Sequence, residues 1–141
     1  MSRIFIGIDP GTHTGLAIWD ATDKRFLQVK TCTIVEAMAT INTIDKGQIA
    51  GLYFEDAKLR QYLPRETSVS EYRGKLMGAG SVKRDSTIWR EYCAYWEIPY
   101  VAVAPRKGMT KWAADYFAKV TGWKGRTSEH SRDAALLVFQ R

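Results

Sequence analysis

The chain has 141 residues and a formal net charge of +6, with 45% hydrophobic and 26% charged residues. This length gives one domain as the default and is enough for a buried core, so we expect a single domain over residues 1–141. No apolar run approaches the roughly 20 residues that span a bilayer, and the apolar run after Arg3 is too short for a secretory signal, so we expect a cytoplasmic protein without membrane attachment.

Apolar runs in the first part of the chain predict three strands, a helix and a fourth strand. The first run is continuous and of strand length, and a turn rich in Pro, Gly and Thr follows it. The strand before the helix is separated from its predecessor by a turn over residues 20–23. In chain order, the expected elements are Ile4–Asp9, Leu16–Trp19, Lys24–Thr33, the helix Val35–Ile44 and the buried strand Ile49–Glu55.

The second part predicts helices around one more strand. Gly122 is a natural helix stop, and Ser128 is a plausible N-cap for the last helix. The expected elements are the helices Tyr62–Arg73 and Asp85–Trp96, the buried strand Tyr100–Ala104, and the helices Thr110–Val120 and Glu129–Phe139. A meander followed by alternating helices and strands predicts an α/β fold with a mixed five-stranded sheet flanked by helices.

Two acids close apolar strands. Asp9 ends the first strand and Glu55 ends the fourth. A buried carboxylate is costly unless it meets water, a partner or a cation, and open α/β sheets bind ligands outside their strand ends. Asp9 alone would be explained better as a turn cap, but two acids that end two apolar strands favour a ligand site.

The last helix carries a third acid and an imidazole. His130 and Asp133 are three residues apart, so a helix places them on one face about 5–6 Å apart at Cβ. A simple contact on the helix surface is the alternative explanation for this pair. Ala134, Leu137 and Val138 add an apolar stripe beside that face, which places the pair at the border of the core.

Together these side chains suit a hard divalent cation. Oxygen-rich sites prefer Mg²⁺, and Mn²⁺ can substitute. Without a cation, two carboxylates roughly 4 Å apart repel by about 4 kcal/mol at an effective dielectric constant of about 20. A bound metal removes this penalty and activates water for attack on a phosphodiester. His130 would serve either as a ligand or to orient that water, and its imidazole favours Mn²⁺ over Mg²⁺.

Several motifs resemble those of the RuvC family of Holliday junction resolvases. Gly7-Ile8-Asp9-Pro10-Gly11 with Thr14-Gly15 looks like the first motif, and Leu52-Tyr53-Phe54-Glu55 is similar to the second acidic strand. Ala104-Pro105-Arg106-Lys107 with the later Lys111 resembles the lysine region, and His130-x-x-Asp133-Ala-Ala-Leu-Leu resembles the C-terminal metal motif. The motifs come in the family's order and cover nearly the whole chain.

The resemblance implies a ribonuclease H-like fold and one RuvC-like nuclease domain over residues 1–141. It also implies a Mg²⁺-dependent homodimer that makes paired nicks in four-way or other branched DNA, as in recombination and repair. Asp9, Glu55, His130 and Asp133 would be both the catalytic residues and the metal ligands. The chain departs from the family at Asp56, where an aromatic residue is usual close by, and in a shortened segment between Lys107 and Lys111.

Basic residues follow the predicted strand ends, where the acids also lie. The positive charge favours a polyanion, and grouped Lys and Arg favour phosphate contacts over a merely solvated surface. Tyr62 and Tyr72 would stack on exposed bases or, as is commoner for tyrosines, pack in the core or an interface. The expected dimer interface around Gly78 holds Tyr72, Leu76, Met77 and Trp89. The expected DNA-binding residues are Lys58, Arg60, Arg73, Lys83, Arg84, Arg106, Lys107 and Lys111.

Other functions remain open at this point. A YqgF-like nuclease acting on RNA shares the fold expectation, because nothing in the sequence distinguishes the two nucleic acids. An inactive DNA-binding module is a further possibility. Asp9-Pro10-Gly11-Thr12 also fits the phosphate loop of the actin and hexokinase type, but those proteins need two such domains and a second phosphate motif.

Overall fold

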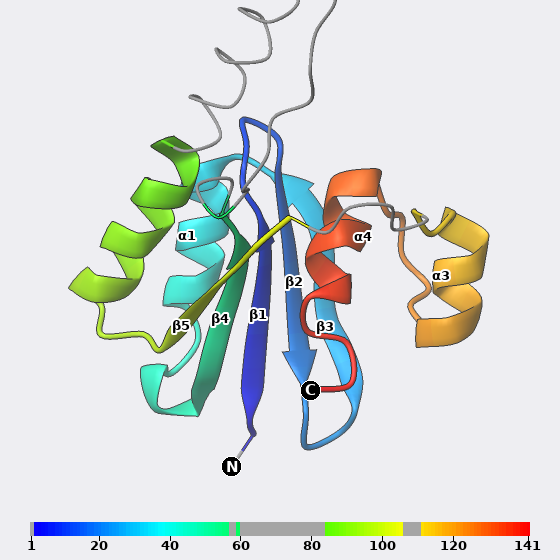
Figure 1. The fold of residues 1–141 in the computed structure, drawn as a ribbon. Coiled ribbons are helices and arrows are strands. Elements are labelled where there is room, and N and C mark those ends of the chain that lie inside the picture. The colour runs from blue at the N-terminus through cyan, green and yellow to red at the C-terminus, as the bar shows by residue number, and fades with distance from the viewer. Residues whose placement is uncertain (1, 57–58, 60–83, 106–110) are drawn as a thin grey trace, which may run out of the picture.

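The architecture comes from a computed structural model, which describes residues 2–56, 59, 84–105 and 111–141. A five-stranded sheet lies at its centre, in the order β3-β2-β1-β4-β5 (Figure 1). Its strands are β1 (Ile4–Asp9), β2 (Thr14–Asp20), β3 (Arg25–Cys32), β4 (Ile49–Glu55) and β5 (Tyr100–Val103). The helices are α1 (Ile34–Asn42), a short 3₁₀ turn (Lys46–Gln48), the helix over residues 84–95, α3 (Ala114–Thr121) and α4 (Glu129–Leu136).

The sheet is mixed, as the sequence predicts. β1, β2 and β3 form an antiparallel meander, whereas β4 and β5 run parallel to β1. α1 and the helix over 84–95 cover one face, and α4 and α3 lie on the other side (Figure 1). The carboxyl ends of β1, β4 and β5 therefore share one edge of the sheet, which is where the acids of interest fall.

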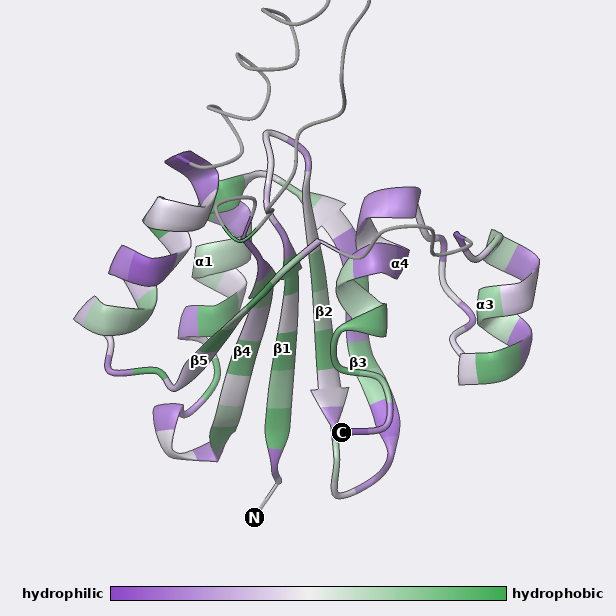
Figure 2. Ribbon diagram, in the orientation of Figure 1, coloured by the Kyte–Doolittle hydropathy of each residue, from purple (hydrophilic) through white to green (hydrophobic). Residues whose placement is uncertain are grey.

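Alternation along β1 assigns its residues to two separate cores. Ile4, Ile6 and Ile8 point to the face covered by α1 and the helix over 84–95, whereas Phe5 points to the face covered by α4. Figure 2 shows apolar residues along the central strands. Asp9 has the parity of Phe5 and Gly7, so it lies on the α4 face.

The helix ends follow the capping residues in the sequence. Ser128 is the N-cap of α4 and forms a reciprocal capping box with Ser131. Gly122 ends α3 in the left-handed conformation, with φ of 76°. α3 begins only at Ala114 and α4 already ends at Leu136, so the predictions of Thr110 as a start and Phe139 as an end are wrong.

Two burial predictions are also wrong. β5 was expected to be buried, but Tyr100 is 39% and Val101 46% exposed, because β5 is the edge strand of the sheet. Trp89 was expected in a dimer interface, but it is fully buried against the sheet. The other expected interface residues, Tyr72, Leu76 and Met77, lie outside the described residues, as does the helix predicted over Tyr62–Arg73. No helix among the described residues is long and apolar enough to cross a membrane.

Candidate active site

Two glycines let α4 lie directly on the sheet. A Cβ atom on Gly7 would come within 2.1 Å of the Ala134 carbonyl oxygen, and one on Gly15 within 2.0 Å of the His130 carbonyl oxygen. Both distances are far below van der Waals contact, so any side chain at either position would push α4 away. The backbone of α4 at residues 130–134 can therefore approach the carboxyl end of β1, where Asp9 lies.

Asp9 and Glu55 lie beside each other on neighbouring strands. β1 and β4 are parallel, and Ile8 is in register with Phe54, so the next residue on each strand is the acid. Since side chains alternate along a strand, both carboxylates have the parity of the α4 face. The register thus explains the sequence pattern of two acids that end two apolar strands.

α4 brings the other two predicted residues to the same edge. Nδ1 of His130 lies 2.9 Å from Oδ2 of Asp9, within hydrogen-bond distance. Asp133 is close enough for its charge to act on Asp9. The His130 ring also stacks loosely with that of His13 in the β1–β2 loop, with centroids 6.5 Å apart. α4 therefore brings both an imidazole and a carboxylate to Asp9.

The electrostatics at Asp9 favour a cation. Burial is the largest cause that raises the pKa of Asp9 above its usual value of 3.8, and the nearby charge of Asp133 raises it further. The His130 hydrogen bond and the charges of His130 and Lys111 act in the opposite direction. The net rise means that the ionised carboxylate is under-compensated where it lies, and an added positive charge would stabilise it.

A lysine accompanies the acids in a way that the sequence did not indicate. Nζ of Lys111 lies 2.5 Å from Oδ2 of Asp133 and 3.5 Å from Oε1 of Glu129. The hydrogen bond to Asp133 is the main cause that raises the pKa of Lys111. Lys111 was expected only as a DNA contact, yet in this structure it supplies a counter-charge to an expected metal ligand.

The donor set fits a hard divalent cation, although the side chains are not drawn together around one point. Within the described ranges, no group of three or more His, Cys, Asp or Glu side chains is close enough to hold a metal ion. Carboxylate oxygens are the ligands that Mg²⁺ prefers, and because burial and the charge of Asp133 raise the pKa of Asp9, a cation there would favour its ionised form. Asp9, Glu55 and Asp133 are thus the residues that would hold the ion, with His130 beside them.

A surface pocket opens next to these acids. Glu55, Lys111 and Asp133 line it together with apolar side chains from the end of β5 and from the last part of α4. The apolar members are Val103, Ala104, Leu136 and Leu137. Two of the predicted ligands therefore face a shared, accessible hollow.

Arg132 fixes the segment that carries Lys111. Its Nε donates to the Trp112 carbonyl oxygen at 2.8 Å, and its Nη1 donates to Oγ1 and the carbonyl oxygen of Thr127 at 2.9 and 3.2 Å. Sequence reasoning missed this role, since a lone Arg on a polar helix gives no signal for it.

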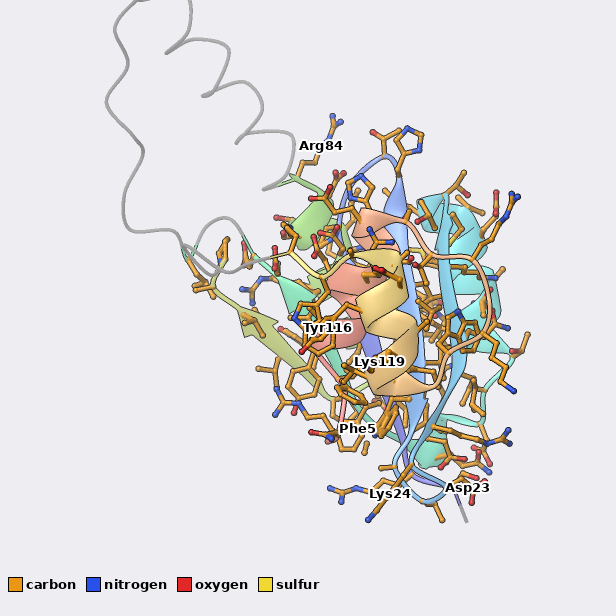
Figure 3. All side chains as sticks on the ribbon, turned by 90° about the vertical axis from the view of Figure 1, so that its right-hand side faces the viewer. Phe5, Asp23, Lys24, Arg84, Tyr116 and Lys119 are labelled. Carbon is orange, nitrogen blue, oxygen red and sulfur yellow. The ribbon has the colours of Figure 1, made fainter. Side chains whose placement is uncertain are left out.

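The other expected DNA contacts are described only at Arg84. Arg84 is exposed, and Figure 3 shows it at the end of the molecule opposite the β2–β3 turn, which holds Asp23 and Lys24. Because that turn adjoins the start of β1, Arg84 lies toward the sheet edge that carries the acids. The remaining predicted nucleic-acid contacts lie outside the described ranges. They are Lys58, Arg60, Tyr62, Arg73, Lys83, Arg106 and Lys107.

Comparisons with known proteins identify the fold. No protein-family model matches the sequence, and no curated protein matches it significantly. Among solved structures, the chain is similar to RuvC of T. thermophilus, solved in complex with a Holliday junction substrate. The TM-score is 0.56 and the sequence identity 17%, and the match covers 98% of this chain and 92% of that one. The mixed five-stranded sheet with its flanking helices is therefore a ribonuclease H-like α/β fold, as the sequence predicted.

Proposed function

We propose that this chain is a single-domain, metal-dependent endonuclease that cuts phosphodiester bonds in four-way or other branched DNA. The observation that carries the proposal is the convergence of Asp9, Glu55, His130 and Asp133 from β1, β4 and α4 on one edge of the sheet. β1, β4 and α4 are separated from one another along the chain by other strands and helices, so only the fold brings these four residues to the same end of the sheet. A core made only for stability has no need of acids at this end of the sheet, where burial and the charge of Asp133 oppose ionisation of Asp9.

Each residue of the set has a distinct task in this proposal. Asp9, Glu55 and Asp133 hold Mg²⁺ or Mn²⁺, and the bound ion supplies an activated water and charge compensation for the phosphate. His130 stays hydrogen-bonded to Asp9 and either adds a ligand or orients the water. Lys111 lies beside Asp133, and in this proposal it contacts the phosphate next to the bond that is cut.

Branched DNA is the substrate that the charge and the fold comparison favour. The chain carries +6 overall, and the solved structure to which it is similar holds a Holliday junction. A four-way junction has two-fold symmetry, so two coordinated nicks call for two matching sites in a homodimer. We therefore propose a homodimer that acts in recombination or repair in the cytoplasm.

The decisive experiment compares cleavage of matched substrates by the purified protein in Mg²⁺. Four-way, flap and linear duplex DNA of the same sequence, with the corresponding RNA junction, separate the candidate activities. We expect symmetric nicks in the four-way DNA and at least about tenfold slower cutting of the duplex, a difference of about 1.4 kcal/mol. Preferred cutting of RNA would favour the YqgF-like alternative, and no cutting of any substrate in Mg²⁺ or Mn²⁺ would refute the nuclease.

Oligomeric state is tested separately. Sedimentation equilibrium at micromolar concentration, with and without four-way DNA, should show a dimer. A monomer under both conditions would refute the dimer while leaving the cleavage chemistry intact.

A further inference from the structure

The residue after Glu55 is a fully buried acid. Asp56 is 0% exposed, and the guanidinium of Arg90 meets it from the helix over 84–95. Nε of Arg90 donates to Oδ2 of Asp56 at 3.2 Å, and Nη2 contacts the same oxygen. Asp56, where the sequence departs from the family pattern, is therefore not a solvated surface acid.

This ion pair belongs to a wider attachment of the end of β4 to that helix. Oγ of Ser86, four residues before Arg90, donates to the Glu55 carbonyl oxygen at 3.1 Å. The Asp56 amide donates to the Val103 carbonyl oxygen at 2.9 Å, so the β4–β5 ladder continues past Glu55. The helix and β5 thus hold both residues at the end of β4.

Ring contacts keep the guanidinium in place. Cζ of Arg90 lies 5.7 Å from the ring centroid of Phe54 and 6.0 Å from that of Tyr100. Both rings lie on the face of the sheet that the helix over 84–95 covers. They stack on each other, with ring centroids 5.9 Å apart. A guanidinium on aromatic faces is restricted in its movement.

We propose that the Asp56–Arg90 ion pair is a positioning device for Glu55, an inference that rests on the proposed nuclease function. Successive side chains on an extended strand point to opposite faces. Holding Asp56 against the helix on the rear face therefore directs Glu55 to the α4 face, beside Asp9. The stability of the fold does not explain the pair, because a buried ion pair commonly gives no more stability than a well-packed apolar pair.

The test replaces both partners at once, so that neither Asp56 nor Arg90 is left as an unpaired buried charge. In the double variant Asp56→Leu/Arg90→Met, residue 56 keeps a side chain that branches at Cγ and residue 90 keeps a long side chain that is unbranched near the backbone. The ionic contact between the two residues is removed. We expect it to fold with a melting temperature close to that of the wild type and to bind four-way DNA in Ca²⁺ with unchanged affinity. Its single-turnover cleavage should fall by about 10- to 100-fold, and its Mn²⁺ dissociation constant should rise by a similar factor, as when groups that orient metal ligands are altered.

Two further variants keep the test decisive. Asp23→Asn/Arg25→Gln removes a solvent-exposed ion pair, 3.9 Å long, in the turn at the opposite end of the sheet, and should cut at the wild-type rate. Ser86→Ala removes the hydroxyl that donates to the Glu55 carbonyl while it keeps Asp56 and Arg90, and should lower the rate by a smaller factor even if the double variant does not fold.

The outcomes separate the inference from the function it rests on. A wild-type protein that does not cut any substrate refutes the proposed nuclease. A wild type that cuts, with a folded double variant that cuts and binds Mn²⁺ as the wild type does, overturns only the positioning role. If the double variant does not fold, wild-type cutting by Ser86→Ala overturns it instead.

Discussion

The two faces of the sheet are built from alternate residues of the same strands, yet they differ in kind. On the face of α1 and the helix over 84–95, β1 contributes Ile4, Ile6 and Ile8 to a continuous apolar core. On the face of α4, the same strand contributes Phe5, Gly7 and Asp9. The first face has large side chains as far as the strand end, whereas the second becomes smaller and then charged toward that end.

This difference shows how a stable sheet can carry a group of acids whose burial and like charge lower the stability of the fold. The large apolar residues of the first face hold the strands in register up to their ends. The glycines of the second face give up side-chain packing so that a helix backbone can bring His130 and Asp133 to the acids. Repelling carboxylates are tolerated because the opposite face and the ladder fix the strands that carry them.

Removing any one acid should have the largest effect. Asp9→Asn, Glu55→Gln and Asp133→Asn should each lower single-turnover cleavage by at least about 100-fold, since losing a ligand should exceed losing a group that merely orients one. Binding of four-way DNA in Ca²⁺ should be retained, because the proposal assigns the phosphate contacts to basic residues and not to the acids. Glu91→Gln, an exposed acid on the helix of the other face, is the matched control and should cut normally. Wild-type cutting by any of the three acid variants would mean that the site is wrongly assigned.

Changing a glycine should break the difference between the faces. Gly15→Ala places a methyl group where the His130 carbonyl lies, and the resulting overpacking should lower the free energy of unfolding by about 1–3 kcal/mol. Because α4 must shift, cleavage should fall as well. Ile6→Val on the other face should cost about 0.5–1.5 kcal/mol and leave cleavage unchanged below the melting transition. Denaturant unfolding and cleavage rates check both; a fully active, fully stable Gly15→Ala would contradict the close approach of α4.

His130 sharpens the comparison within the site. His130→Ala should reduce cleavage by about tenfold or more, within the range for groups that orient metal ligands. His130→Asp should stay active, because it supplies another carboxylate. Imidazole nitrogen favours Mn²⁺ more than carboxylate does, so the ratio of the Mn²⁺ to the Mg²⁺ rate should be lower in His130→Asp than in the wild type. Equal ratios in the two proteins would show that His130 does not contact the ion.

The pH dependence of stability should give the smallest effect. Asp9 has a raised pKa, so the folded protein binds this proton more tightly than the unfolded chain. Its contribution is greatest below the unfolded value of about 4 and is lost as the pH rises through the higher folded value. In EDTA, the free energy of unfolding of the wild type should therefore fall over that interval relative to Asp9→Asn. A gap between the two that stays constant from pH 3 to pH 7 would contradict the raised pKa.

Much of the fold follows from local sequence patterns. The apolar runs of β1 and β4 predict both strands with their observed bounds, because continuous burial is a property of the run itself. Ser128 and Gly122 mark the start of α4 and the end of α3 through capping chemistry within one turn. The positions of Asp9 and Glu55 at strand ends, and the three-residue spacing of His130 and Asp133, are likewise visible in the sequence.

What the sequence could not reveal depends on which elements lie next to each other. β5 has the composition of a buried strand, yet it is exposed because it is last in the strand order. Lys111 lies on Asp133, 22 residues away, and Arg90 lies on Asp56, 34 residues away. Neither pair has a spacing that a helix or a hairpin would bring together.

The sequence by itself therefore determined the elements, their order and the residues that cannot be buried without a partner, because these depend on periodicity and on chemistry close along the chain. The tertiary structure decided which partners those residues receive. Strand order, register and the depth to which α4 approaches Gly7 and Gly15 set the distances between side chains from different elements. Electrostatic interactions depend on those distances. The raised pKa of Asp9 and the ion pair between Lys111 and Asp133 therefore exist only in the folded protein.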